Sequence, residues 1–192
     1  TGLRDPGLTP YGSQVVSRMN ALGMAIDVSH CGDRTTLDAI AASAAPVLVT
    51  HSNCRSLVPS SRRCKPDEAI RKLAARGGVF GVTMIRPFVR SHGPTTIEHV
   101  LQHIDHVARL TGVEHVGVGT DVDLDGRDGP RRPRRSDLDE MDYANKIYEL
   151  TQGLVRRGYS NHAIALILGG NFQRALQTIW EQPCCPTASG AG

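Results

Sequence analysis

The sequence predicts an α/β fold built on a parallel sheet, and three observations support this prediction. Four short apolar runs alternate along the chain with segments whose apolar residues recur at helical spacing. The runs are bounded by these helical segments rather than by hairpin turns, which is typical of parallel strands buried on both faces. Three of the runs end in residues that can carry chemistry: His30, His51 and Asp121.

The first helix is expected from Tyr11 to Leu22. Thr9 can cap it, Pro10 suits its first position, and Gly23 ends it. The first strand, Met24 to His30, follows at once. The chain therefore begins with a helix packed next to the first strand of the sheet.

A second helix begins at Asp33, which can cap it, and leads to the second strand, Pro46 to His51. The loop from Ser52 to Lys65 is too long for a simple connector, and loops of this kind are usually functional or disordered. A third helix begins at Pro66 and precedes the third strand, Val79 to Met84.

Thr95 or Thr96 caps a fourth helix, which leads to the fourth strand, Glu114 to Asp121. Three histidines lie on this helix: His99, His103 and His106. Their spacing of four and then three residues imitates a ligand set, but their charged neighbours predict an exposed polar face instead.

Two helices are expected at the end of the chain, from Asp137 to Arg157 and from Ser160 to Trp180. The pair Gly169-Gly170 predicts a kink in the second, where the backbone approaches something closely. The small and polar residues 183–192 predict a disordered tail. The acidic run Asp123 to Gly126 resembles the start of a calcium loop but lacks the later glutamate.

Composition excludes several classes of function. A chain of 192 residues is long enough for one globular domain with a core. Its net charge is only +3. The one basic cluster, residues 127–135, is broken by proline and predicts a solvated loop, so no nucleic-acid partner is expected. No apolar stretch approaches the ~20 residues of a membrane span and no signal peptide is present, so we expect a cytoplasmic protein. The chain starts at Thr1 rather than Met, which suggests further sequence upstream.

The five cysteines form no Cys-x-x-Cys pair, so neither a disulfide framework nor a structural zinc knot is indicated. A reducing compartment fits this pattern. Cys31 and Cys54 follow the two strand-end histidines closely and could serve as ligands or nucleophiles. We favour the simpler interpretation that they are small buried hydrophobic residues.

The carboxyl ends of parallel strands meet on one rim, so His30, His51 and Asp121 should converge there. Two imidazoles and an acid on one rim suggest a metal-assisted hydrolase. Four strands cannot close a barrel. The chain is therefore either a small open sheet or half of an eight-stranded barrel.

Five motifs occur in order along the chain: Gly7-Leu-Thr-Pro-Tyr-Gly12, Asp27-Val-Ser-His30, Thr50-His-Ser-Asn-Cys-Arg55, Gly117-Val-Gly-Thr-Asp-Val-Asp123, and Arg156-Arg-Gly-Tyr-Ser160 with Leu168-Gly-Gly-Asn-Phe172. Together they resemble the membrane dipeptidase (renal dipeptidase) family of zinc peptidases. The resemblance covers nearly the whole chain from Gly2 to Trp180.

The resemblance implies a (β/α)8 barrel with two zinc ions, of which this chain supplies strands five to eight within residues 1–182. It also implies that His30 and His51 are ligands of one zinc and that Asp121 is the catalytic acid or base. The implied substrate is a dipeptide, and the resemblance allows a D-residue at its carboxyl end. The sequence leaves the oligomeric state open, with a homodimer as one alternative.

One of Arg62 and Arg63 should match the family's clamp for the substrate carboxylate. Arg63 is preferred, because a one-residue insertion in a loop is easier than a shifted helix. Cys64 follows where the family commonly has asparagine, and Phe88 stands where some members place a tyrosine that contacts substrate.

The family's His-x-Asp pair and bridging glutamate have no counterpart in this sequence. The chain therefore looks like the C-terminal part of the enzyme. Because catalytic zinc usually has three protein ligands, we expect the chain alone to bind zinc weakly and to have little activity.

Two alternatives remain open at the level of the sequence. In the first, His30 and His51 are hydrogen-bonded histidines at strand ends, and Asp121 caps a helix. In the second, the chain is an open-sheet α/β module that binds an anion through its arginine-rich loops without catalysis.

Overall fold

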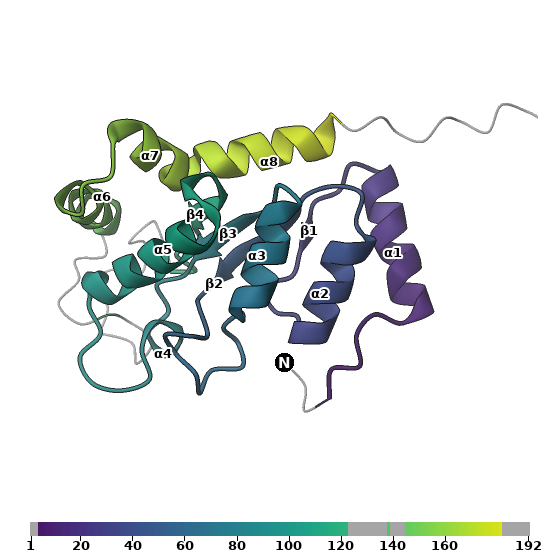
Figure 1. Cartoon of the computed structure of the whole chain (residues 1–192), viewed down its shortest axis with the longest axis horizontal. Coiled ribbons are helices and arrows are strands. Elements are labelled where there is room, and N and C mark those ends of the chain that lie inside the picture. The colour runs from purple at the N-terminus through teal and green to yellow at the C-terminus, as the bar shows by residue number, and fades with distance from the viewer. Residues whose placement is uncertain (1–3, 123–137, 139–144, 182–192) are drawn as a thin grey trace, which may run out of the picture.

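A computed structural model describes residues 4–122, 138 and 145–181, and its centre is a four-stranded parallel sheet (Figure 1). The strands pair in their order along the chain: β1 (Ile26–Asp27), β2 (Val47–Ser52), β3 (Val79–Val82) and β4 (Val116–Val118). Consecutive parallel strands joined by helices are the repeat of a (β/α)8 barrel, whereas a doubly wound sheet reverses its strand order. The predicted α/β fold with a parallel sheet is confirmed.

Helices connect the strands and follow the last one. They are α1 (Pro10–Ala21), α2 (Asp33–Ala42), α3 (Asp67–Ala75), α4 (Arg86–Val89), α5 (Ile97–Thr111), the 3-10 turn η1 (Val113–His115), α6 (Lys146–Arg156), α7 (Asn161–Ala165), the π-helical turn η2 (Leu166–Gly170) and α8 (Asn171–Trp180). The short helix α4, between β3 and α5, was not among the helices expected from the sequence.

Local capping residues start two of the helices as predicted. The Thr9 hydroxyl accepts a hydrogen bond from the backbone N–H of Gly12 at 3.0 Å, and Pro10 is the first residue of α1. Thr96 caps α5 together with the side chain of His99, which accepts from the Thr96 backbone N–H at 3.1 Å.

The prediction that Asp33 caps α2 is wrong. The carboxylate of Asp5, 29 residues upstream, accepts from the backbone N–H groups of Arg34 and Thr35 at 2.6 and 3.1 Å. The carboxylate of Asp33 instead pairs with Arg55 of the loop after β2. A distant carboxylate thus satisfies the free N–H groups of this helix end.

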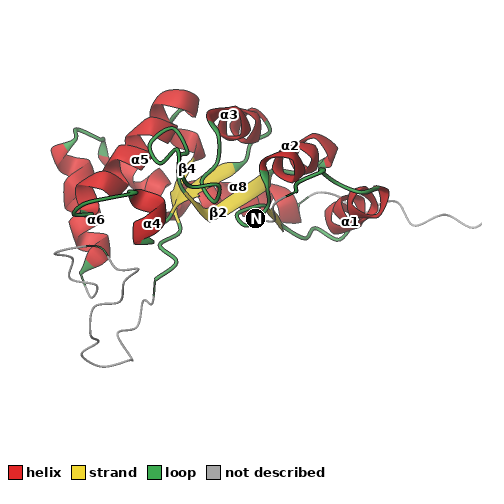
Figure 2. Cartoon of the chain, turned by 90° about the horizontal axis from the view of Figure 1, so that it is seen from below, coloured by secondary structure: helices red, strands yellow, loops and turns green. Residues whose placement is uncertain are grey.

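The sheet is buried on both faces. Helices α2, α3 and α5 cover one face (Figure 2), where Val47 and Val49 of β2 join the main core. Leu48, between them, packs instead with Ala175 and Ile179 of α8. Burial on both sides explains why the strands are apolar at successive positions.

Helix α8 lies across the amino ends of the strands, along the top of the molecule in Figure 1. Arg174 donates to the backbone oxygens of Gly77 and Glu114 at 3.2 and 2.8 Å, and Asn171 donates to those of Val113 and Val116 at 2.8 and 2.7 Å. These acceptors lie just before β3 and at or just before the start of β4. The helix therefore braces the end of the sheet opposite to the carboxyl ends of the strands.

The expected helix from Ser160 to Trp180 is divided into α7 and α8 by the turn η2. The reason given for the kink is wrong at Gly169, because a Cβ added there would meet no atom within 4 Å. The turn instead places the fully buried Asn171 within hydrogen-bond distance of Val116, the first residue of β4.

The strands are shorter than expected at their carboxyl ends. His30 lies three residues beyond β1, and Asp121 lies three residues beyond β4, whereas His51 is inside β2. A polar residue directly precedes two of these side chains: Ser29 precedes His30, and Thr120 precedes Asp121. Single backbone hydrogen bonds continue past the strand ends, from the N–H of Val28 to Leu48 and from the N–H of Met84 to Thr120, at 2.9 and 3.0 Å.

The prediction that the α5 histidines form an exposed polar face is wrong for His103, whose exposed fraction is 1%. Its ring accepts from the backbone N–H of Cys54 at 3.1 Å and contacts the backbone oxygen of Val89 at 3.0 Å. Burial lowers the pKa of His103 to about 4. The loop after β2 and helix α4 cover this part of α5.

Among the residues described, no helix is long and apolar enough to cross a bilayer. Several predictions concern segments that lie outside the described residues: the acidic run 123–126, the basic cluster 127–135, the helix start at Asp137 and the tail 183–192.

Candidate functional site

The two strand-end histidines meet. The Nε2 atoms of His30 and His51 lie 2.9 Å apart, and the ring centroids are 5.0 Å apart at an interplanar angle of 57°. Because β1 and β2 are adjacent and parallel, the turn after β1 places His30 beside the last residues of β2. The structure thus brings together the two residues predicted as metal ligands.

A bulge in β2 gives His51 its direction. From Val49 to Ser52 the chain advances three residues while its partner β3 advances two, from Phe80 to Val82. The extra residue falls at Thr50 and His51 and interrupts the alternation of the strand. Bulges of this kind re-aim side chains beside functional sites.

The separation of the two nitrogens fits one metal ion held by both. With zinc–nitrogen bonds of ~2.0–2.1 Å, two imidazole nitrogens lie about 2.9–3.3 Å apart for ligand angles of about 90–109°. Within the described part of the chain, no group of three histidine, cysteine, aspartate or glutamate side chains could hold a metal. The pair therefore supplies two nitrogen donors at a spacing that one such ion could bridge.

A carboxylate not identified from the sequence connects the two histidine segments. Asp27 accepts from the backbone N–H and the hydroxyl of Ser29 at 3.0 and 2.6 Å, and from those of Thr50 at 3.1 and 2.9 Å. The Thr50 hydroxyl also lies 2.8 Å from Nδ1 of His51. Polar residues at the ends of otherwise apolar strands were the signal for this network.

Asp121 is the only non-glycine residue with a positive φ in the described part of the chain, with φ of 58°. This conformation costs free energy for a residue with a side chain, and such strain collects at functional sites. The pKa values of His30 and Arg63 are both lowered, the first mainly by the charge of Arg63 and the second mainly by burial, and the exposed carboxylate of Asp121 opposes both shifts. Its charge therefore acts on the residues gathered at the rim.

Arg63 rather than Arg62 reaches this rim. Its guanidinium donates to the backbone oxygen of His51 at 2.7 Å and to the Ser52 hydroxyl at 3.1 Å, and it lies 5.4 Å from the centre of the Phe88 ring. The buried Nε of Arg63 has no hydrogen-bond partner among the described residues. Arg62 is exposed. The choice of Arg63 agrees with this geometry.

The Arg63 guanidinium is the largest influence on His30. It lowers the pKa of His30, as do burial and His51, while the carboxylates of Asp121 and Asp27 act in the opposite direction. Burial lowers the pKa of Arg63 itself. A positive charge next to His30 thus favours the neutral imidazole, which is the form that binds a metal.

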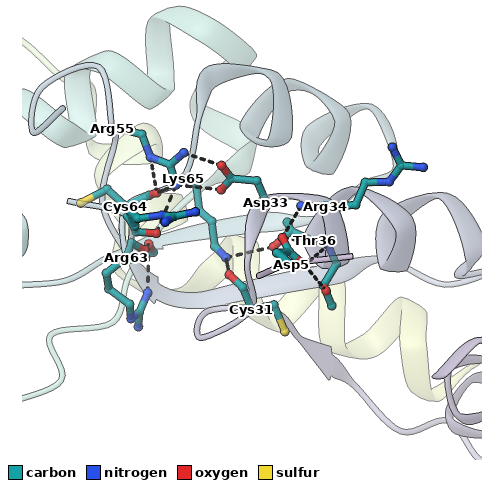
Figure 3. A network of polar contacts seen from close by, with 12 residues as sticks. Asp5, Cys31, Asp33, Arg34, Thr36, Arg55, Arg63, Cys64 and Lys65 are labelled. Atoms are coloured by element: carbon teal, nitrogen blue, oxygen red, sulfur yellow. Dashed lines mark hydrogen bonds and ion pairs between the residues drawn. The ribbon is translucent and has the colours of Figure 1, made fainter. Parts of the chain in front are cut away.

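Figure 3 shows how the loop that carries Arg63 is held against the start of α2. Lys65, only 1% exposed, donates to the backbone oxygen of Cys31 at 2.6 Å and to the Thr36 hydroxyl at 3.0 Å. Arg55 pairs with Asp33 and donates to the backbone oxygen of Cys64. Burial lowers the pKa of Lys65 to about 8. These contacts fix the loop next to the residue that follows His30.

The cysteines near the site have the properties of buried packing residues. Cys54 and Cys64 are fully buried, and burial raises the pKa of both thiols. Cys31 is partly buried, and burial raises the pKa of its thiol as well. Raised thiol pKa values are the reverse of what a nucleophile or metal ligand needs, so the simpler interpretation of Cys54 is supported.

Comparison with known proteins places this geometry in a wider context. A family model described as membrane dipeptidase (peptidase family M19) matches residues 2–182. The dipeptidase verJ of Clonostachys rogersoniana is 36% identical over 175 residues, which are 91% of this chain and 42% of that protein. The chain thus spans less than half the length of this relative.

Solved structures resemble the fold over nearly all of the chain. An amidohydrolase from Pseudomonas aeruginosa matches with a TM-score of 0.79 at 28% identity, covering 92% of this chain and 59% of that one. A metallopeptidase from Rhodobacter sphaeroides, bound to a phosphinate mimic of the dipeptide L-Ala-D-Ala, matches with a TM-score of 0.75 at 27% identity, covering 91% and 48%.

Proposed function

The chain belongs to the membrane dipeptidase family, peptidase family M19, and from this premise we propose that it forms the C-terminal part of a zinc-dependent dipeptidase. Residues 1–182 would contribute the second half of one (β/α)8 domain. The observation that carries the proposal is the approach of His30 and His51 to 2.9 Å between their Nε2 atoms. A cytoplasmic location and a homodimer stay predictions of the sequence.

His30 and His51 would hold one zinc ion at the rim, with further ligands from outside the described residues. When bound, zinc supplies Lewis acidity that activates water and polarises the scissile carbonyl. Neutral imidazoles suit this metal. The contribution of this chain is to hold the two nitrogens close together, and the charge of Arg63 lowers the pKa of His30 and so favours its neutral ring.

Arg63 would bind the free carboxylate of the dipeptide. Two of its nitrogens are held by His51 and Ser52, so the guanidinium has a fixed position, and the ring of Phe88 lies beside it at 5.4 Å. A fixed guanidinium can bind a carboxylate with two parallel hydrogen bonds. Such a clamp would limit the substrate to two residues, because a longer peptide has no carboxylate at that place.

Asp121 would move the proton. Its exposed carboxylate can accept a proton from the attacking water and return it to the leaving amine. Acceptance of a D-residue at the carboxyl end of the substrate is supported by the Rhodobacter sphaeroides structure, whose ligand mimics L-Ala-D-Ala.

Hydrolysis of L-Ala-D-Ala and L-Ala-L-Ala, measured with the chain and with the chain extended by its upstream sequence, tests the proposal. We expect the extended protein to cleave dipeptides, to lose activity with a chelator and to regain it with zinc. The same protein should not cleave the amidated dipeptide, which lacks the carboxylate. Anion binding that a chelator does not change, with no hydrolysis by either protein, would favour the anion-binding module instead.

A further inference from the structure

Asp27, the acid that connects the two histidine segments, accepts an unusually large number of hydrogen bonds. Asp27 is the last residue of β1, and its carboxylate accepts four hydrogen bonds, two from Ser29 and two from Thr50. Partial burial raises the pKa of Asp27, but these hydrogen bonds outweigh it and leave the pKa below its usual value. Asp27 is therefore ionised near neutral pH and acts only as an acceptor.

An acceptor of this kind determines where the hydroxyl protons point. The Thr50 hydroxyl lies 2.9 Å from one oxygen of Asp27, and the Ser29 hydroxyl lies 2.6 Å from the other. Each hydroxyl has a single proton. The two hydroxyl oxygens also lie 3.2 Å from each other, but their contacts with the ionised carboxylate are shorter, and a carboxylate is the stronger acceptor. We therefore assign both protons to Asp27, and the Thr50 oxygen then has only lone pairs to offer its third neighbour.

That neighbour is Nδ1 of His51, at 2.8 Å from the Thr50 oxygen. Because Thr50 can only accept there, Nδ1 of His51 must carry the proton, and in the neutral ring Nε2 is left with a free lone pair. This Nε2 is the atom that lies 2.9 Å from Nε2 of His30.

We propose that Asp27 is a positioning residue that acts through Thr50 to hold His51 as the Nδ1–H tautomer, with its Nε2 lone pair directed at the zinc site. The inference rests on the proposed function only for the identity of the metal. A metal-binding histidine usually donates its second N–H to a carboxylate or carbonyl, and here a threonine hydroxyl relays that interaction.

Asp27 also sets the distance between the two imidazoles through its second partner. The Ser29 hydroxyl accepts from the backbone N–H of His51 at 3.1 Å while it donates to Asp27. The turn that carries His30 is thereby bound to the bulge that carries His51. Without the carboxylate of Asp27, His51 should no longer be held as the Nδ1–H tautomer, and the distance between the two imidazoles should no longer be fixed.

The tautomer can be measured without any metal. Two-bond ¹H–¹⁵N correlation NMR of the chelator-treated protein, at a pH where both imidazoles are neutral, distinguishes a protonated from an unprotonated ring nitrogen. We expect Nδ1 of His51 to be protonated in the wild type. In Asp27→Asn the amide nitrogen can donate to Thr50, so its hydroxyl can turn to Nδ1 and the Nε2–H tautomer should appear.

Zinc affinity gives the second readout, measured on the chain extended by its upstream sequence by competition with a chromophoric chelator. Asp27→Asn and Thr50→Val should both weaken zinc binding by about 10- to 100-fold, whereas Thr50→Ser, which keeps the hydroxyl, should restore it to near the wild-type value. Asp38→Asn, which removes a carboxylate paired with Arg34, is the matched control and should change neither readout.

The outcomes separate this inference from the proposed function. An Nε2–H tautomer at His51 in the wild type, or unchanged tautomer and zinc affinity in Asp27→Asn, would overturn the inference and leave the peptidase proposal standing. An Asp27-dependent Nδ1–H tautomer, found together with no zinc binding by the chain extended by its upstream sequence, would contradict the peptidase proposal alone. If Asp27→Asn does not fold, the pair Thr50→Val and Thr50→Ser decides, and equal zinc affinity in these two would overturn the relay.

Discussion

His51 and His103 carry the same side chain into opposite environments. His51 is partly exposed at the rim, with its Nε2 facing another imidazole, while His103 is buried with both ring nitrogens bonded to backbone groups. The sequence placed His51 correctly at the end of a strand but took His103 as exposed, because its helix also carries charged residues. The difference in exposure between the two histidines arises from the segments that cover each of them in the folded protein.

The buried His103 makes stability depend on pH. Its pKa is about 4 in the folded protein and ~6.5 in the unfolded chain, so the unfolded chain binds the proton more readily. The contribution of His103 is complete above pH ~6.5 and is lost as the pH falls through 6.5 towards 4. The expected loss in the free energy of unfolding is about 3 kcal/mol over this range.

Urea unfolding between pH 7.5 and 4.5 measures this effect. His103→Asn should be less stable than the wild type at pH 7.5, because an amide fits the two backbone partners less well, and it should lose less stability on acidification. An acid dependence as steep in the variant as in the wild type would assign the effect to other groups.

The two neighbouring arginines provide a second test at this scale. Arg63→Lys should lower kcat/KM for dipeptides by about 10- to 100-fold, mainly through KM, because an ammonium group cannot make two parallel hydrogen bonds to a carboxylate. Arg62→Lys is the matched control and should leave kcat/KM unchanged. An equal loss in both variants, or a loss only in Arg62→Lys, would reverse the assignment of the clamp.

Asp121 combines a strained backbone with a proposed proton-transfer role. Asparagine tolerates positive φ nearly as well as aspartate, so Asp121→Asn should keep the free energy of unfolding within about 0.5 kcal/mol of the wild type. Its kcat should fall by about 10²- to 10⁴-fold, because the amide cannot accept a proton. Steady-state assays and urea unfolding check the two parts, and a fully active Asp121→Asn would exclude the role.

At the scale of elements, the position of α8 in the fold predicts a role in stability. It spans the amino ends of the strands, far from the rim, so its residues should affect stability and not chemistry. This division agrees with the general rule that the two faces of such a barrel serve stability and catalysis separately.

Asn171 tests that division. Its buried amide donates to the backbone oxygens of Val113 and Val116, and Asn171→Ala would leave both without this donor. We expect a loss of about 2–4 kcal/mol in the free energy of unfolding, with zinc affinity unchanged in the folded protein. Gln173→Ala, an exposed neighbour on α8, should cost less than about 0.5 kcal/mol. Equal effects of the two changes would contradict the brace.

The elements also show which kind of structure a sequence can predict. The cap of α1 by Thr9 was predictable because donor and acceptor are three residues apart. The cap of α2 by Asp5 was not, because only the folded chain brings residues 29 positions apart together. The convergence of His30 and His51 followed from parallel strand order, whereas the Asp27 network depends on a bulge that no local pattern announces.

At the scale of the whole molecule, the four strands and their helices form a consecutive parallel array that matches half of a larger barrel. The match covers 92% of this chain and 59% of the Pseudomonas aeruginosa amidohydrolase. The candidate site lies at the rim of this array and contains two imidazoles, one arginine and one strained aspartate. For the proposed zinc site, the described residues supply only the two imidazoles as ligands.

The number of ligands predicts how much zinc the 192-residue chain binds on its own. Two imidazoles bind zinc weakly, because each further protein ligand adds affinity and prevents loss of the ion to solvent. After dialysis against metal-free buffer, elemental analysis should find far fewer than two zinc ions per chain, and His51→Ala should remove what remains. Extension by the upstream sequence should raise the content towards two ions, since the other ligands would then be present. Two tightly held ions in the chain alone would contradict the prediction that this chain is only part of the enzyme.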